Sequence, residues 1–81
     1  MSILNISRGV SDMFDYSPLW ETMRKREVSQ YQLIKEYNIS TGTLDSLRQN
    51  RSITMHTLDN LCQILNCTPN DIVKIEKEDD N

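Results

Sequence analysis

The stretch SQYQLIKEYNISTGTLDSLRQN, from Ser29 to Asn50, carries two helix-start signals that are eleven residues apart. Ser29 precedes the first helical run, and Gln32, three residues later, completes the pattern of a capping box. Ser40 precedes the second run in the same way. Asn38 lies between the runs, and asparagine tolerates the left-handed backbone conformation that turns a chain after a helix. The stretch therefore predicts two short helices joined by a tight turn.

The second of these helices offers little to a protein core, because only Leu44 and Leu47 are large and apolar. Two short helices joined by such a turn are typical of a helix-turn-helix motif, whose second helix lies in the major groove of DNA. A low, polar outer face lets base edges come within hydrogen-bonding distance, and the helix N-terminus suits phosphate. The alternative is an ordinary solvent-exposed face. We expect the small residues of this helix to face base edges: Thr41, Gly42, Thr43 and Ser46.

Helical periodicity continues on both sides of this pair. Ser17, as an N-cap, and Pro18 begin a helix whose apolar stripe contains Leu19, Trp20 and Met23. Thr54 is the expected N-cap of a further helix, in which four apolar residues recur at helical spacing: Leu58, Leu61, Cys62 and Leu65. TPND at residues 68–71 indicates a short fifth helix or turn, and DIVKIE at residues 71–76 is compatible with helix or strand. We predict an all-α bundle of about five helices, in which residues 14–16 and the DIVKIE segment could form a small terminal β pair.

Three motifs, SQYQLIKEYNIS, STGTLDSLRQN and TLDNLCQILNCTPNDI, are similar to those of a known family. Residues 17–75 resemble the Cro/repressor-type helix-turn-helix proteins, which have the lambda-repressor-like fold and regulate transcription. The resemblance implies base contacts from Thr41, Gly42, Thr43 and Ser46. It also implies contacts to the DNA backbone from a second set of residues: Gln30, Ser40, Arg48, Gln49, Asn50 and Arg51. Gln30 is in addition expected to brace the recognition helix.

The sequence departs from the family pattern at two positions of the motif. Ile34 occupies a position that is normally alanine, which implies slightly wider spacing between the two helices, and Asn38 replaces the usual turn glycine. The recognition helix also begins without Gln, Asn or Arg, and Asp45 places a negative charge near phosphates. A second interpretation therefore stays open. In this second interpretation the chain is a protein-interaction module, either antitoxin-like or a phage-encoded adaptor, that recognises little DNA sequence.

The formal net charge of −3 argues at first against nucleic acid, but the acidic surplus lies mostly in the ending EKEDDN. Cys62 and Cys67 have no second pair or histidine at ligand spacing, so we expect reduced, packed thiols and no metal site. His56 has no partner for acid-base chemistry. No nucleophile–base pair, glycine-rich phosphate loop or carboxylate cluster occurs, so we expect neither an enzyme nor a cofactor.

The remaining aromatic and basic residues are expected to pack in the protein or to face solvent, without contacting DNA. Trp20, Tyr31 and Tyr37 are expected to pack rather than to stack on bases, with Tyr37 on the buried face of its helix. Lys35 and the run at residues 24–26 are expected to form a solvated face. No apolar run is long enough to cross a membrane, and no signal peptide is evident, so a cytoplasmic location is expected.

The domain organisation follows from these patterns. Residues 1–12 are predicted to be an N-terminal arm, residues 13–75 the helix-turn-helix domain, and residues 76–81 an acidic tail. We expect a sequence-specific DNA-binding transcriptional regulator, a repressor that acts as a homodimer on operator half-sites of double-stranded DNA. One such module buries little surface and contacts few bases, which is why a dimer is expected.

Overall fold

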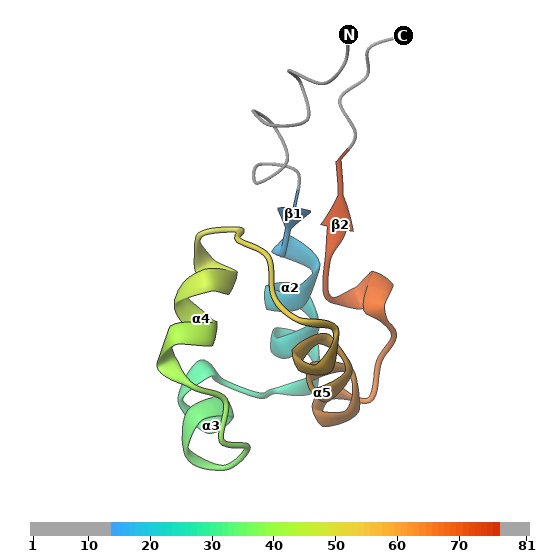
Figure 1. Ribbon diagram of the computed structural model, residues 1–81. Helices are drawn as coiled ribbons and strands as arrows, with labels where there is room; N and C mark the ends of the chain where they lie inside the picture. Colours follow the sequence, from blue (N-terminus) through green and yellow to red (C-terminus); the bar gives the residue numbers. More distant parts are fainter. Residues whose placement is uncertain (1–13, 77–81) are drawn as a thin grey trace, which may run out of the picture.

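Four α-helices, one 3-10 turn and a pair of short strands make up residues 14–76, the part of the chain that the computed structural model describes (Figure 1). In chain order they are β1 (Phe14–Asp15), α2 (Ser17–Arg26), α3 (Gln30–Lys35), α4 (Thr41–Arg48), α5 (Met55–Leu65), η2 (Pro69–Asp71) and β2 (Lys74–Ile75). The predicted all-α bundle is confirmed. The TPND segment is a 3-10 turn rather than a fifth α-helix. The predicted arm at residues 1–12 and residues 77–81 of the predicted tail lie outside the described residues.

The core draws on every helix. Its buried members are Tyr16, Leu19, Met23, Leu33, Ile39, Leu44, Leu47, Leu61, Leu65 and Ile72. Leu44 and Leu47 are completely buried, so they fasten α4 to the bundle and leave its other face outward. Ile34 is half-buried and packs against this core. Burial of these bulky side chains is the main force that holds the short helices, which would be unstable in isolation.

The terminal β pair is confirmed. Phe14 pairs with Ile75, and Asp15 pairs with Lys74, in an antiparallel ladder. The two strands lie side by side above α2 in Figure 1, so the first and last described elements meet at one end of the bundle. The Phe14 ring stacks on the buried Tyr16 ring, with 6.5 Å between centroids. This contact connects the ladder to the core.

The predicted helix caps at Ser29, Ser40 and Thr54 are confirmed. Ser29 and Gln32 form a complete capping box, with bonds of 3.1 and 2.9 Å. Ser40 and Thr54 each accept a backbone N–H three residues ahead. The prediction that Ser17 is an N-cap is wrong, because Ser17 is already helical.

The carboxylate of Asp15 accepts an open N–H group at the start of α2. It accepts the backbone N–H of Ser17 at 2.9 Å and the Ser17 hydroxyl at 2.6 Å. These two bonds, the hydroxyl first, hold the pKa of Asp15 below its usual range. The start of α2 is therefore satisfied from the strand that precedes it.

Helices α2, α4 and α5 end in the same way, although none ends with glycine. Glu27, Asn50 and Asn66 follow these helices with positive φ angles of 59°, 57° and 55°. In each case the next residue donates its N–H to a carbonyl five residues back, over 2.8 to 2.9 Å. This is the Schellman arrangement, which satisfies carbonyls left open at a helix end.

Candidate nucleic-acid interface

The turn between α3 and α4 has the geometry of a helix-turn-helix motif. Asn38 adopts the left-handed conformation, with φ of 59°, as predicted. Ile39 then donates its N–H to the Leu33 carbonyl at 2.9 Å and buries its side chain. These two features fix the direction in which α4 leaves α3. The N-terminus of α4 consequently points outward from the bundle with its small residues first.

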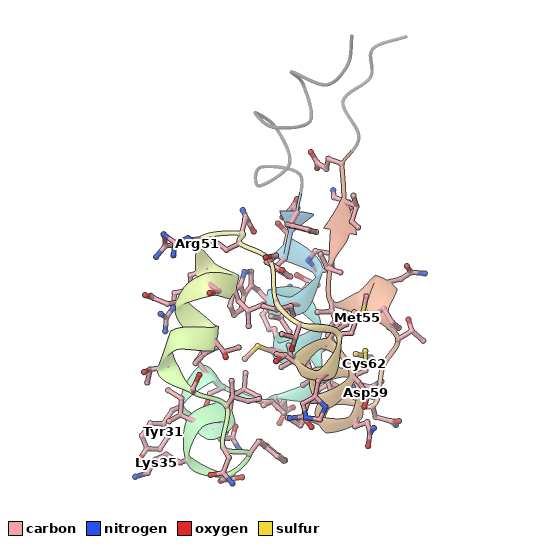
Figure 2. All side chains as sticks on the ribbon, viewed as in Figure 1. Tyr31, Lys35, Arg51, Met55, Asp59 and Cys62 are labelled. Carbon is pink, nitrogen blue, oxygen red and sulfur yellow. The ribbon has the colours of Figure 1, made fainter. Side chains whose placement is uncertain are left out.

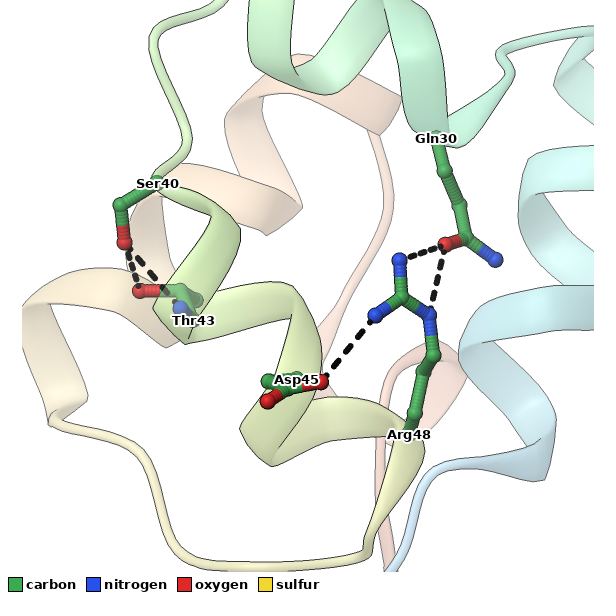
Figure 3. A network of polar contacts seen from close by, with 5 residues as sticks. All are labelled: Gln30, Ser40, Thr43, Asp45 and Arg48. Carbon is green, nitrogen blue, oxygen red and sulfur yellow. Dashed lines mark hydrogen bonds and ion pairs between the residues drawn. The ribbon is translucent and has the colours of Figure 1, made fainter.

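The predicted base-contacting residues are placed at this N-terminus. Thr41 and Gly42 are exposed, whereas Thr43 and Ser46 are half-buried. Ser40 accepts the Thr43 N–H at 3.1 Å and donates its hydroxyl to the Thr43 hydroxyl oxygen at 2.9 Å (Figure 3). The Thr43 hydroxyl therefore keeps its own proton for another acceptor.

Neither packing nor backbone conformation requires glycine at position 42. A Cβ atom built at this position would meet only the Ser40 hydroxyl oxygen, at 3.9 Å, which is an ordinary contact. Gly42 is also helical and has no positive φ angle that would demand glycine. Glycine in a helix costs about 0.5–1 kcal/mol relative to alanine. The chain therefore bears this cost at a position where packing does not require it.

The N-termini of α4 and α5 open into one polar hollow of about 330 Å³. One side carries α4 residues, namely Ser40, Gly42, Thr43 and Ser46, and the other carries Ser52, Ile53, Thr54 and Thr57. The second set was missed from the sequence. Its only signal was the capping pattern of Thr54, which was interpreted as a helix start alone. Small hydroxyl side chains from the starts of two helices therefore line one hollow.

Arg48 is engaged within the chain. Its guanidinium donates to the Gln30 side-chain oxygen through Nε at 3.1 Å and Nη2 at 2.8 Å, and its Nη1 lies 3.3 Å from Asp45 (Figure 3). The Gln30 bond links the start of α3 to the end of α4. The ion pair partly neutralises Asp45, whose charge the sequence placed near phosphates. Gln30 and Arg48 thus hold the two helices of the motif together.

Asn50 and Arg51 join the end of α4 to the start of α2. The Asn50 side-chain oxygen accepts the Tyr16 N–H at 3.1 Å, and the Tyr16 hydroxyl donates to the Arg51 carbonyl at 2.6 Å. Burial raises the pKa of Tyr16. The side chains of Gln49 and Arg51 are exposed at the same end. Of the arginines predicted to contact phosphate, Arg51 therefore presents its guanidinium to solvent, while Arg48 is held by neighbours.

Two aromatic residues do not pack as expected. Tyr31 is 68% exposed and Tyr37 is 39% exposed. Tyr37 lies beyond the last residue of α3, in the turn, so the helical period no longer directs it inward. Tyr31 points outward, and the Lys35 ammonium lies over its ring at 6.0 Å from the centroid. Trp20 is half-buried against the core, as predicted.

The two cysteines are free thiols, and both are half-buried. Burial is the main cause that raises the pKa of both thiols, and it brings the pKa of Cys67 to about 11. Residues 14–76 contain no group of three or more His, Cys, Asp or Glu side chains suited to a metal ion. Between residues 14 and 76, no helix has the length and apolar character needed to cross a bilayer.

An outward-facing short helix, a left-handed turn before it and a buried pair of leucines behind it define a helix-turn-helix domain. The model of the Cro/C1-type HTH DNA-binding domain matches residues 18–78. The chain belongs to this family.

The structure is also similar to a crystal structure of the transcriptional regulator VanUg. The TM-score is 0.74 at 26% sequence identity, and the similarity covers 82% of this chain and 88% of that one. Both descriptions name DNA-binding or regulatory proteins rather than enzymes. A comparison with curated proteins finds no match.

Proposed function

We propose that the protein is a sequence-specific DNA-binding transcriptional regulator, a repressor that acts as a homodimer. The observation that carries the proposal is the outward N-terminus of α4, where small polar residues share a hollow with the N-terminus of α5. Family membership and the similarity to a protein described as a transcriptional regulator support it. Repression would be steric, because a dimer on an operator would block polymerase.

In this proposal, Thr41, Gly42, Thr43 and Ser46 contact base edges. The two threonines offer hydroxyl groups and methyl groups, and Gly42 lets the helix backbone approach a base edge closely. The set is short, so each half-site is expected to specify few base pairs.

A second group positions the protein on the DNA backbone. The predicted members are Gln30, Ser40, Arg48, Gln49, Asn50 and Arg51, to which we add Ser52, Thr54 and Thr57 from the hollow. Arg51 supplies a solvent-exposed cation. Arg48 and Gln30 act mainly by bracing α4 against α3, which sets the angle at which the helix enters the groove.

Salt dependence of binding tests this function. A DNA-binding protein releases counterions, so its affinity for random-sequence and operator duplexes should fall steeply as salt rises. Arg51→Ala should weaken binding to all sequences alike and reduce the slope by about one. Lys25→Ala, which removes the same charge from the exposed surface of α2, serves as the control and should leave the slope unchanged. An adaptor protein would show no saturable DNA binding even at low salt, which would reject the proposal.

A further inference from the structure

One surface of the molecule exposes large apolar side chains that the DNA-binding proposal does not use. Met55 at the start of α5 is 77% exposed, and Ile75 in β2 is 62% exposed. Figure 2 shows Met55, Asp59 and Cys62 along α5, on the other side of this view from Tyr31, Lys35 and Arg51. Exposed apolar groups that cluster on one surface of a small protein indicate a contact site.

This surface is hollowed into two grooves that share a border. The first groove, of about 500 Å³, runs along α5 from Met55 past Asp59 to Cys67. The second, of about 570 Å³, is bordered by β2 and contains Lys74 and Ile75. Leu58 and Pro69 line both grooves, so they lie at the centre of one continuous surface. We call this surface the α5–β2 face.

We propose that the α5–β2 face binds a second copy of this chain, through a two-fold axis that passes near Leu58 and Pro69. The inference rests on the proposed function, which requires a dimer, and adds the surface that forms it. A two-fold axis at the shared border places the first groove of one copy against the second groove of its partner. Exposed side chains at the edges of each groove, Met55 and Ile75, can then enter the facing groove of the partner copy.

The side chains of the two grooves are complementary under this operation. Met55 of one copy would meet Ile75 of the other, which joins the two most exposed apolar side chains of this face. Asp59 of one copy would face Lys74 of the other. Asp59 accepts a hydrogen bond from Gln63 at 3.0 Å, and within residues 14–76 Lys74 forms two long ion pairs, of 3.8 Å to Asp15 and 3.7 Å to Glu76. Both side chains are exposed, and a carboxylate and an ammonium can each take a further partner beside these contacts.

The position of the face also suits a dimer on DNA. The first turn of α5 borders the polar hollow through Thr54 and Thr57 and borders the α5–β2 face through Met55 and Leu58. An axis beside α5 therefore brings the two hollows, and the two α4 N-termini, to neighbouring positions. Symmetric half-sites require this arrangement.

Removal of the two exposed apolar side chains tests the interface. The double variant Met55→Ser/Ile75→Ser should raise the dimer dissociation constant about a hundredfold or more, as measured by sedimentation velocity over a concentration series. The matched control is Tyr31→Ser, which removes a similarly exposed large side chain from α3 and should leave the constant unchanged. Circular dichroism checks that each variant keeps its helices.

Charge reversal tests the pairing across the axis. Asp59→Lys alone and Lys74→Asp alone should each weaken the dimer about tenfold, because like charges then face each other. The double reversal should restore the constant to within about threefold of the original. Absence of restoration would reject the proposed register.

The native thiols give a measurement that needs no variant. Cys62 and Cys67 line the first groove, so alkylation of both thiols should slow as the protein concentration rises into the dimer range. Unchanged alkylation in a protein shown to be dimeric would overturn the inference.

Failure of the inference differs from failure of the proposed function. If the Met55→Ser/Ile75→Ser variant remains as dimeric as the original chain, the interface lies elsewhere and the inference is wrong, although dimeric DNA binding stands. If the original chain is monomeric at every concentration, the inference and the homodimer both fail. Binding of the monomeric variant to a single half-site at low salt would show that DNA recognition is independent of this face.

Discussion

Gly42 and its two threonine neighbours show how single residues shape the proposed binding surface. The backbone at residue 42 has no positive φ angle that would require glycine, and a Cβ atom there would make only an ordinary contact, with the Ser40 hydroxyl oxygen at 3.9 Å. Thr41 is exposed beside it. Thr43 keeps a hydroxyl proton although Ser40 donates to its oxygen. Packing therefore does not require a small residue at position 42, and the proposed base contacts would benefit from one.

Replacement of Thr41 and Thr43 by alanine should relax base preference without unfolding the protein. The Ser40 cap depends on the Thr43 backbone N–H, which alanine retains. Selection of bound sites from random DNA should recover a less restricted motif for the double variant. Asn60→Ala, on the exposed surface of α5, is the control and should return the original motif. An unchanged motif for the threonine variant would show that other residues contact the bases.

Cys67 should react unusually slowly with alkylating reagents. Its pKa is raised to about 11, mainly by burial, whereas an exposed thiol titrates near about 8.5. Peptide mapping of iodoacetamide adducts against pH, at protein concentrations too low for association, should give a midpoint near the raised value. A midpoint close to that of a free thiol would contradict the buried position.

The raised pKa of Cys67 also predicts how the stability of the folded protein changes with pH. The folded state favours the neutral thiol. Cys67 therefore makes its full contribution to the free energy of unfolding at pH values below the pKa that its thiol has in the unfolded chain. It is lost as the pH rises from about 8.5 toward the folded value.

At the level of helices, the C-terminal residues of α2, α4 and α5 set the direction of the chain after each helix. Each ends with a left-handed residue that is glutamate or asparagine rather than glycine. Asparagine accepts this conformation more readily than glutamate does, because its short polar side chain bonds locally. Glu27 is therefore the strained member of the three.

Glu27→Gly should stabilise the protein by about 1 kcal/mol, because glycine adopts positive φ without steric cost. Glu36→Gly is the matched control. Glu36 has φ of −102°, so glycine there should instead destabilise by about 0.5–1 kcal/mol. Urea unfolding followed by circular dichroism measures both variants. Equal effects of the two substitutions would refute strain at residue 27.

At the level of the whole molecule, packing decides how the helix-turn-helix motif is presented. Buried Leu44 and Leu47 hold α4 to the bundle, while Arg48 fixes it to α3. Tyr16, Asn50 and Arg51 link the far end of α4 to α2. These contacts hold α4 at one position on the surface, which the proposed dimer would need in order to match two half-sites.

Two half-sites spaced about one helical turn apart should bind the homodimer more tightly than other spacings. Insertion of about half a turn should reduce affinity toward that of one half-site, because the second half-site then faces away. Fluorescence anisotropy with a set of operator duplexes measures this. Affinity that does not vary with spacing would show that the bound species is not a two-fold dimer.

Much of the motif was predictable from neighbouring residues. The capping box at Ser29, the caps at Ser40 and Thr54, and the turn at Asn38 all depend on hydrogen bonds or backbone angles within a few residues. The strand character of residues 14–15 and 74–75 was also visible locally, although their pairing joins distant parts of the chain. Ser17 was misassigned as a cap because the helix begins one residue earlier than expected: Tyr16 is at the N-cap position, and Asp15 accepts the N–H of Ser17.

Features formed by distant segments were not predictable. The bond between Tyr16 and Asn50 spans 34 residues, and the hollow joins Ser40 to Thr57. The α5–β2 face likewise combines residues of α5 with Ile75. Amino-acid types and short-range spacing determine where helices begin, where they end and which side chains are small. Which of those surfaces then meet, and which remain exposed to solvent, depends on long-range packing of the apolar side chains, whose arrangement no local pattern specifies.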